Sequence, residues 1–255
     1  MTDFPRSITA VNHVAPAPRR VRGIAGGEVV FDTTRALYVW EWPHYPQYYI
    51  PQADIRPGAL TPEGDPEPNR QGDAQRQQLR AGRLERPAAA RLIVSSPVPG
   101  LSSTVRFEWA ALDQWFEEDE EIFVHPRNPY TRVDALRSKR TVRIERDGVV
   151  LAASASPVMV FETGLPTRYY LDQRDIRFEH LAPSGTRTEC PYKGRVSGYW
   201  SARIGERIYP DLAWMYSFPT RQLLPIAGLV AFLNERVDVF IDGIQQPRPK
   251  THMSD

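Results

Sequence analysis

A short segment in the second half of the chain, Cys190-Pro191-Tyr192-Lys193-Gly194, contains the residues best suited to chemistry. Proline favours an extended backbone at the preceding Cys190, and the Lys193 ammonium would favour the thiolate form of a nearby thiol. A nucleophile also needs a base, and the nearest histidine, His180, lacks the spacing of a recognised Cys–His pair. Cys190 is therefore a candidate nucleophile, with a buried packing thiol as the alternative.

Aromatic residues are frequent on both sides of this segment, which favours ligand binding. A pocket with flat aromatic walls and charged side chains at its edge would hold a planar or nucleotide-like molecule by stacking and a few polar contacts. The alternative is core packing, because tyrosine and tryptophan are ordinary strand residues. The candidate ligand-binding residues are Tyr169, Tyr170, Asp175, Arg177, Tyr192, Lys193, Tyr199, Trp200 and Trp214, with Tyr216 close by.

Composition narrows the classes of function. A net charge of +1 argues against a broadly basic surface that binds nucleic acid, and a single cysteine excludes an internal disulfide and a zinc site built from thiolates. The five histidines are scattered, and the chain has no glycine-rich phosphate loop and no nucleophile elbow. We expect no metal, no cofactor and no nucleic-acid partner. Without a long apolar segment or a signal-peptide pattern, we also expect no membrane partner and a cytoplasmic protein.

The chain contains an internal repeat. Residues 21–60 and 142–181 align without a gap at a constant offset of 121, with 13 identical pairs among 40. This is far above chance, so the sequence predicts two copies of one small domain. We expect the domains to span 1–138 and 139–255, with an Arg-Val-Asp tripeptide near the end of each copy. The copies would form a pseudo-symmetric pair within a monomer, or the protein would be a homodimer.

Alternating apolar and polar residues predict short strands. Asp147-Gly148 favours a tight hairpin turn within 142–151, and further hairpins are expected within 201–209 and 229–241. Only two short helical segments are expected, at 110–117 and 220–224. Strands this short and closely spaced are typical of an all-β sandwich or barrel.

The two copies differ after residue 60. The first copy continues, near 61–90, with a segment rich in proline, glycine, glutamine and charge, which we expect to be a mobile insertion. The second copy has the Cys190–Gly194 segment in the same place. For residues present in both copies, such as Glu41 and Glu162, a structural role is the simplest explanation. The second copy alone therefore holds the better site candidates, and the pocket is expected in the second domain or between the copies.

The order of several uncommon motifs within residues 142–243 resembles the DUF427 family, also labelled nucleotidyltransferase-like family 9. These motifs include Arg-Tyr-Tyr, Asp-Ile-Arg, Cys-Pro-Tyr-Lys-Gly and Ala-Trp-Met-Tyr. The resemblance implies a small domain similar to the β-tent type, without zinc, and it implies no settled activity. The first copy resembles a divergent member in tandem. The positions that match the family's motifs are Glu162, Tyr170, Asp175, Cys190, Lys193, Tyr199, Trp200 and Trp214.

Three hypotheses of function follow. The leading one is a small-molecule binding protein whose second domain places Lys193 and Arg177 against anionic or carbonyl groups, and Trp200 or Trp214 against a flat face. The second is an enzyme at the same cleft. It would use Cys190 as nucleophile, or Asp175 and Glu162 as acid and base. The third is a structural or interaction protein that contacts a partner through the acidic run 117–121, itself expected to be a solvated helix end, and through residues 62–89.

Overall fold

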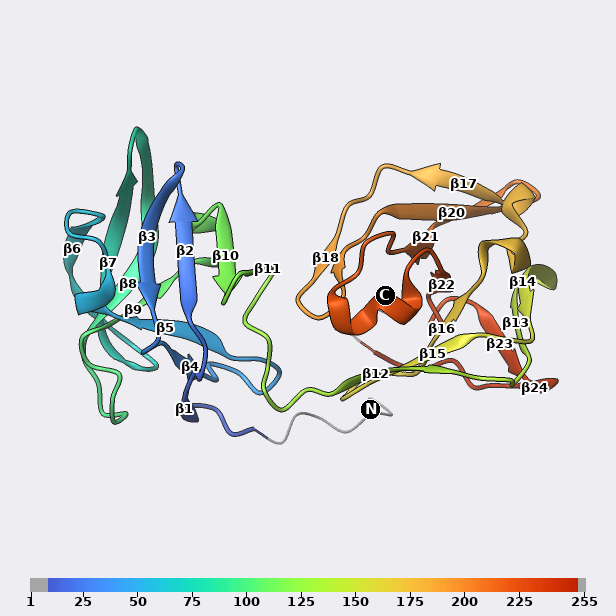
Figure 1. The fold of residues 1–255 in the computed structure, drawn as a ribbon, viewed down its shortest axis with the longest axis horizontal. Coiled ribbons are helices and arrows are strands. Elements are labelled where there is room, and N and C mark those ends of the chain that lie inside the picture. Colours follow the sequence, from blue (N-terminus) through green and yellow to red (C-terminus); the bar gives the residue numbers. More distant parts are fainter. Residues whose placement is uncertain (1–8, 252–255) are drawn as a thin grey trace. The chain divides into compact units, whose positions relative to one another are not determined.

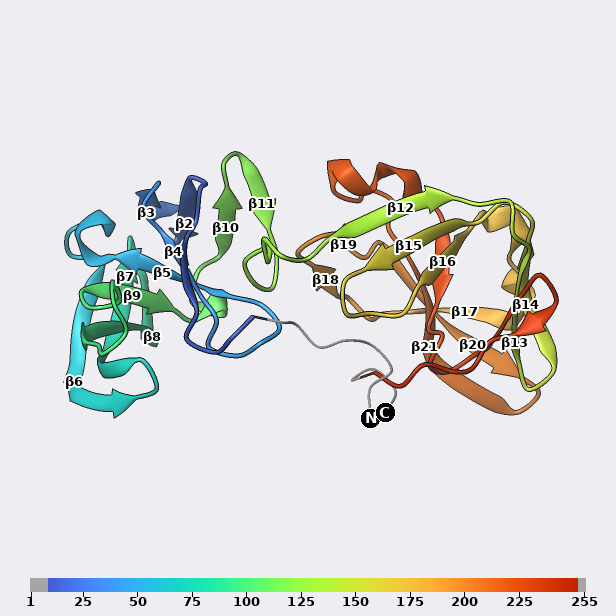
Figure 2. The same ribbon diagram turned by 90° about the horizontal axis from the view of Figure 1, so that it is seen from below.

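The computed structural model describes residues 9–251 and divides the chain into two compact units, with the division between Asn128 and Pro129. Each unit is built of antiparallel strands with a few short 3-10 helices. Two sheets lie in layers within each unit (Figures 1 and 2). The expectation of an all-β protein in two similar halves is confirmed.

The first unit contains a seven-stranded sheet with the order β1-β4-β5-β9-β8-β7-β6 and a four-stranded sheet with the order β11-β10-β2-β3. We call these the large and the small sheet. The helices are η1 (Gln52–Asp54) and η2 (Trp109–Ala111). The strands are β1 (Val14–Pro16), β2 (Val21–Ala25), β3 (Glu28–Thr33), β4 (Leu37–Val39), β5 (Gln47–Pro51), β6 (Leu60–Asn69), β7 (Gly72–Ala81), β8 (Leu84–Ser95), β9 (Thr104–Phe107), β10 (Gln114–Glu117) and β11 (Glu120–Ile122).

The second unit repeats this plan, with a large sheet ordered β12-β15-β16-β22-β21-β20-β17 and a small sheet ordered β14-β13-β23-β24. The helices are η3 (Gln173–Asp175), η4 (Phe178–His180) and η5 (Arg221–Ile226). The strands are β12 (Val133–Arg137), β13 (Val142–Arg146), β14 (Val149–Ser154), β15 (Val158–Glu162), β16 (Arg168–Leu171), β17 (Leu181–Ser184), β18 (Glu189–Cys190), β19 (Gly194–Arg195), β20 (Gly198–Ile204), β21 (Arg207–Met215), β22 (Val230–Phe232), β23 (Asp238–Ile241) and β24 (Ile244–Gln245).

The two topologies correspond strand by strand. From edge to edge, β1-β4-β5-β9-β8-β7-β6 matches β12-β15-β16-β22-β21-β20-β17, and β3-β2-β10-β11 matches β14-β13-β23-β24. The second unit adds the β18–β19 hairpin in the connection from β17 to β20. In the first unit the same connection is the short turn between β6 and β7. These two connections occupy the same place in the fold.

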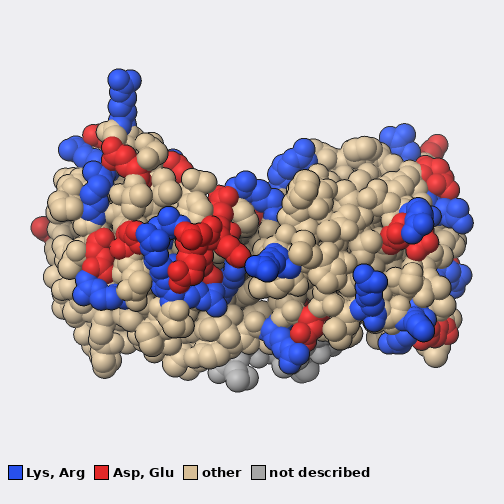
Figure 3. Space-filling model, in the orientation of Figure 1, with Lys and Arg blue, Asp and Glu red and all other residues tan. Residues whose placement is uncertain are grey.

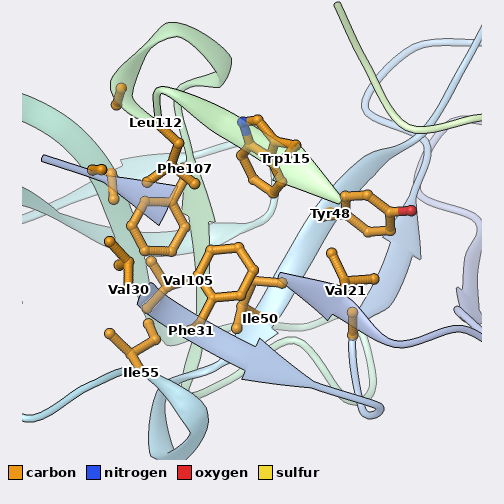
Figure 4. Packing of buried hydrophobic residues seen from close by; sticks show 14 of the residues in the cluster. Val21, Val30, Phe31, Tyr48, Ile50, Ile55, Val105, Phe107, Leu112 and Trp115 are labelled. Carbon is orange, nitrogen blue, oxygen red and sulfur yellow. The ribbon is translucent and has the colours of Figure 1, made fainter. Parts of the chain in front are cut away.

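The core of each unit lies between its two sheets. In the first unit Val21, Phe31 and Trp115 from the small sheet pack against Ile50 and Phe107 from the large sheet (Figure 4). The Phe31 ring centroid lies 5.2 Å from that of Phe107 and 5.5 Å from that of Trp115. Burying each such side chain contributes about 1.5–3 kcal/mol. The equivalent cluster of the second unit includes Val142, Ile144, Leu151, Met159, Leu171, Leu212, Phe232 and Val239.

The prediction that residues near 61–90 form a mobile insertion is wrong. These residues form most of β6, β7 and β8, a meander at the edge of the large sheet. One face of the meander is exposed and polar, while Leu79 and Ala81 are buried on the other. Its glycines supply the positive φ that bulges and turns require, with Gly64 at a register shift in β6. The composition resembles that of a loop because half of each strand faces water.

The second unit begins earlier than residue 139. β12 pairs with β15 from Val133 opposite Glu162 to Arg137 opposite Val158, so residues 133–137 are its first strand. The tripeptide at 132–134 is therefore not the counterpart of Arg236–Asp238, which leads into β23. The first-unit counterpart of β23 is β10.

Two of the three expected hairpins are present. β13 and β14 turn at Asp147 and Gly148, which have φ values of 49° and 77°. β20 and β21 form the hairpin expected within 201–209. Residues 229–241 do not form one, because β22 joins the large sheet and β23 joins the small sheet.

The helical predictions are half right. A 3-10 helix, η5, lies where 220–224 was expected to be helical. In 110–117, by contrast, η2 ends at Ala111 and β10 follows. The acidic run 117–121 spans the β10–β11 turn and is not a helix end.

Gly72 fixes the turn between β6 and β7. Its φ is +130°, and a Cβ atom placed there would lie 2.1 Å from the carbonyl oxygen of Ser95. We expect Gly72→Ala to lower the free energy of unfolding by more than about 2 kcal/mol, measured by chemical denaturation. Gly64→Ala, at a φ of +76° with open space around it, is the control and should cost about 1 kcal/mol. Equal losses in the two variants would contradict this account of the turn.

Candidate functional site

Strand alternation distributes the candidate residues of the second unit over two faces of its large sheet. The inner face packs against the small sheet, and the outer face turns away from it. On β15, Val158 and Val160 belong to the outer cluster and Met159 to the inner one. Tyr170, Tyr199, Trp214 and Tyr216 also belong to the outer cluster, and Tyr169 and Trp200 to the inner one.

The Cys190–Gly194 segment belongs to the outer side. β18 pairs with β19 so that Cys190 is opposite Gly194, which closes a hairpin around residues 191–193. Thr220, just before η5, holds this hairpin in place. Its hydroxyl donates to the Tyr192 carbonyl at 2.5 Å, and its backbone N–H donates to the Lys193 carbonyl at 3.1 Å.

The Lys193 ammonium is buried and forms an ion pair with Glu162, and each of the two side chains is 9% exposed. Lys193 Nζ also lies 4.0 Å from Cys190 Sγ. Burial lowers the pKa of Lys193, but its electrostatic interactions with Cys190, Glu162 and Tyr170 outweigh burial, so the pKa lies above its ordinary value of 10.5. Lys193 is therefore charged at neutral pH and already has a counter-ion.

Cys190 is not activated by this lysine. Burial raises the pKa of the Cys190 thiol above 9.0, Lys193 opposes that shift, and Glu162 adds to it. The thiol is therefore protonated at neutral pH. The sequence indicated Lys193 as an activator but gave no sign that Glu162, from a different strand, would compensate its charge.

Two further polar contacts occupy the outer face. Burial raises the pKa of Tyr170 to about 12, and Trp214 Nε1 donates to its hydroxyl at 3.3 Å. Arg168 donates to both carboxylate oxygens of Glu235, at 2.6 and 2.8 Å. This buried pair escaped the sequence analysis because its partners are 67 residues apart and share no motif.

The remaining aromatic candidates lie on the other side of the sheet. Tyr169 and Trp200 pack against the inner core, and the Trp200 ring meets Phe178 edge-on at 5.7 Å. The sheet therefore separates Trp200 from Lys193, so the version of the expected pocket in which these two residues meet is wrong. Trp214, the alternative stacking residue, lies on the same face of the sheet as Lys193.

Asp175 and Arg177 are also placed away from Lys193. Asp175 ends η3, and the backbone N–H of Arg177 donates to the Leu151 carbonyl of β14 at 2.9 Å. Both residues therefore lie beside the small sheet. Asp175 and Glu162 are on different sides of the large sheet, so they do not form an acid–base pair.

The outer face of the first unit carries charge where the second unit carries an apolar and an aromatic residue. In the second unit Tyr170 pairs with Ala231, and Ala231 pairs with Trp214. At the equivalent places on β9 and β8 the first unit has Arg106 and Arg91, which are direct cross-strand partners. Two guanidinium groups thus replace a methyl group and an indole.

These arginines line a cavity of about 400 Å³. Glu41, the counterpart of Glu162, accepts from the Tyr49 hydroxyl at 3.0 Å and from Arg106 Nε at 3.2 Å. The β6–β7 turn, which has the place of the Lys193 hairpin, forms another wall. The lining residues are Glu41, Trp42, Gln47, Asn69, Arg70, Gln71, Arg91 and Arg106.

The wall formed by the β6–β7 turn is held by its own hydrogen bonds. Asn69 Oδ1 accepts from the Gln71 backbone N–H at 2.7 Å, and the Gln71 carbonyl accepts from the Ser96 hydroxyl. The Gln71 side chain donates to Asn12 Oδ1 at 3.3 Å, and the residue is only 5% exposed. These hydrogen bonds fix the conformation of the turn that forms the wall.

The arginines differ in how far their charges are compensated. Burial opposes the charge of Arg106, but Glu41 and Glu108 outweigh it and raise its pKa above its ordinary value. Arg91 Nη2 lies 3.3 Å from Glu108, and its side chain is 51% exposed. Arg70 is exposed and has no ion-pair partner among residues 9–251. The cavity therefore presents a surplus of positive charge.

The donors in this cavity suit an anion. Within residues 9–251, no group of three or more His, Cys, Asp and Glu side chains could hold a metal ion. Over the same range, no helix is long and apolar enough to cross a membrane. Guanidinium and amide N–H groups instead donate hydrogen bonds to carboxylate or phosphate oxygens.

We expect Cys190 to react with iodoacetamide more slowly than free cysteine at pH 8, because its pKa is raised. Mass spectrometry of the intact protein over time measures this rate. Protein unfolded in urea provides the control, since there the thiol should react at the free rate. Faster reaction in the folded protein would restore the nucleophile hypothesis.

The Arg168–Glu235 pair predicts a pH dependence of stability. Burial alone raises the pKa of Glu235, but hydrogen bonds from Arg168 and Thr251 outweigh it, so the folded-state pKa lies below 4.5. The stabilisation is thus complete above about pH 4.5 and is lost as the pH falls through the folded-state pKa. Glu235→Gln should cost about 3–5 kcal/mol at pH 7, because it leaves Arg168 buried without a counter-ion.

Chemical denaturation of the wild type and of Glu235→Gln between pH 3 and pH 7 measures this dependence. The difference in unfolding free energy between the two proteins should narrow as the solution becomes more acidic. A difference that stays constant over the range would show that Glu235 contributes nothing through its charge.

A family model described as a domain of unknown function, DUF427, matches residues 13–115 and residues 134–243. Each matched segment falls within one of the two units. Together the segments span most of the chain. No curated protein matches it. The chain therefore belongs to the DUF427 family, as a tandem protein that contains two copies of the domain.

Proposed function

We propose that this protein binds a small molecule that bears an oxyanion, and that the cavity of the first unit is its binding site. One observation carries the proposal: Arg70, Arg91 and Arg106 line one cavity of about 400 Å³. This volume is within the range of about 300–1,000 Å³ typical of small-molecule sites. The planar fork of each guanidinium matches the two oxygens of a carboxylate or phosphate.

The three arginines have different roles in this proposal. Arg106, 15% exposed and paired with Glu41, is held in one orientation and provides a fixed positive end to the cavity. Arg91 and Arg70 are more exposed, so their long side chains can turn toward an incoming anion. The amide groups of Gln47, Asn69 and Gln71 add neutral donors and acceptors that orient the rest of the ligand.

The position of the cavity in the fold supports the same conclusion. It lies on the outer face of the large sheet, beside the connection that in the second unit carries Lys193. The second unit is the weaker candidate for the site, because its Lys193 is buried and already neutralised by Glu162. Both copies have an ion pair on this face, Glu41 with Arg106 in the first and Glu162 with Lys193 in the second. The first copy also has an open cavity and further positive charge.

The enzyme hypothesis has less support. The Cys190 thiol has a raised pKa, and the sheet separates Asp175 from Glu162. These are the residues on which both versions of that hypothesis depended.

The interaction hypothesis is also weaker, because the acidic run is largely compensated. Glu117 is 3% exposed and pairs with Arg19, and Asp119 pairs with Arg22. Figure 3 shows acidic and basic side chains mixed over the first unit. Residues 62–89 belong to sheet strands, so deleting them would break the fold rather than remove a docking loop.

Isothermal titration calorimetry with inorganic phosphate, phenyl phosphate and benzoate tests the proposal. We expect at least one of these probes to bind the wild type, and Arg70→Gln combined with Arg91→Gln to weaken binding by about tenfold or more. Arg177→Gln removes an exposed positive charge from the second unit and should leave the affinity unchanged. The proposal fails if no probe binds the wild type, or if the double variant, shown by circular dichroism to be folded, binds as tightly as the wild type.

A further inference from the structure

We infer that Trp42 is a stacking platform within this cavity, and that the ligand is therefore a planar oxyanion, an aromatic or conjugated ring that bears a carboxylate or a phosphate. This inference rests on the proposed function and specifies its ligand class. It is carried by the surroundings of Trp42, whose side chain lines the cavity together with the arginines.

Core packing does not explain Trp42. The residue is 41% exposed and belongs to none of the hydrophobic clusters of the described chain. An indole with this exposure forgoes a large part of its possible burial energy, because an aromatic ring contributes to stability in proportion to the area it removes from water. An exposed aromatic ring that lines a polar cavity is the arrangement expected of a ligand contact.

Trp42 has no parallel stacking partner among residues 9–251. Its ring meets His44 at 4.8 Å with an interplanar angle of 74°, and Tyr45 at 4.7 Å with an angle of 87°. Both contacts are edge-to-face. Space for offset stacking of a flat ring against the indole is therefore not already taken by a parallel protein ring.

Contacts made by its neighbours in sequence hold the segment that carries Trp42. Tyr45 stacks on His125 at 3.6 Å with an interplanar angle of 4°, and Asn128 Nδ2 donates to the His44 carbonyl at 3.0 Å. These contacts hold the neighbours of Trp42 and so limit the positions of its ring. A platform fixed in this way loses little conformational entropy when a ligand stacks on it.

The second unit lacks this combination. At the repeat offset of 121, the counterpart of Trp42 is Thr163, whose hydroxyl accepts from the Arg132 backbone N–H at 3.1 Å. The places of Arg91 and Arg106 are taken by Trp214 and Ala231. The indole and the arginines thus occur together in the first copy only, as expected if they contact one ligand.

A comparison of flat and non-flat probes of equal charge tests the inference. Benzoate is compared with cyclohexanecarboxylate, and phenyl phosphate with cyclohexyl phosphate, so the two pairs also distinguish carboxylate from phosphate recognition. We expect the wild type to bind the flat member of at least one pair about tenfold more tightly. Trp42→Leu should abolish that preference and should bind the non-flat member as well as the wild type does.

Phe218→Leu is the matched control, because Phe218 is an aromatic residue of the second unit with 89% exposure. It should change neither affinity nor preference. If Trp42→Leu does not fold, the ring protons of wild-type-bound benzoate provide a second readout, since stacking on an indole shifts their NMR signals upfield. A wild type that binds flat and non-flat probes equally overturns the planar-ligand inference and leaves oxyanion binding intact. A wild type that binds none of the probes overturns oxyanion binding itself.

Discussion

The pleat of the large sheet determines, in both units, which side chains face the core and which are available for chemistry. Neighbouring residues on a strand point to opposite faces, so each large sheet buries its inner face against the small sheet and needs a separate cover for its outer face. In the second unit, side chains from η5 and from Val196 supply part of that cover. In the first unit, Val98 and Leu101 cover one part of the outer face and leave the polar part hollow. The chemistry available on this face depends on how completely the cover fills it.

The two copies use the same face in opposite ways. In the second unit Lys193, Glu162, Arg168 and Glu235 are paired beneath the surface, and breaking either pair would leave an uncompensated buried charge. The first unit retains the counterparts of Glu162 and Tyr170, which are Glu41 and Tyr49. It also has additional guanidinium groups on this face, and burying them under an apolar cover would cost much free energy. In our proposal, duplication thus left one copy with a filled, structural face and the other with an open, binding face.

Much of the fold could be predicted from local patterns. The hairpin at Asp147 and Gly148 and the all-β class follow from period-two alternation and turn residues, which act over a few positions. The polar strands β6 to β8 could not be predicted in the same way, because their register depends on neighbouring strands far along the chain. The site was harder still. Arg91 and Arg106 are aligned with Trp214 and Ala231 only through strand pairing, and that equivalence is invisible without the sheet.

Repeated motifs and period-two alternation can be recognised in the linear chain, so they were enough to establish the duplication, the β-rich character of both copies and the family. Which residues lie side by side could be learned only from the folded protein. Tyr169 and Tyr170 are adjacent in sequence, yet one packs in the inner core and the other lies on the outer face. Tyr199 and Trp200 are divided in the same manner. A shift of one residue in register exchanges the two faces, and register is set by hydrogen bonds between distant strands.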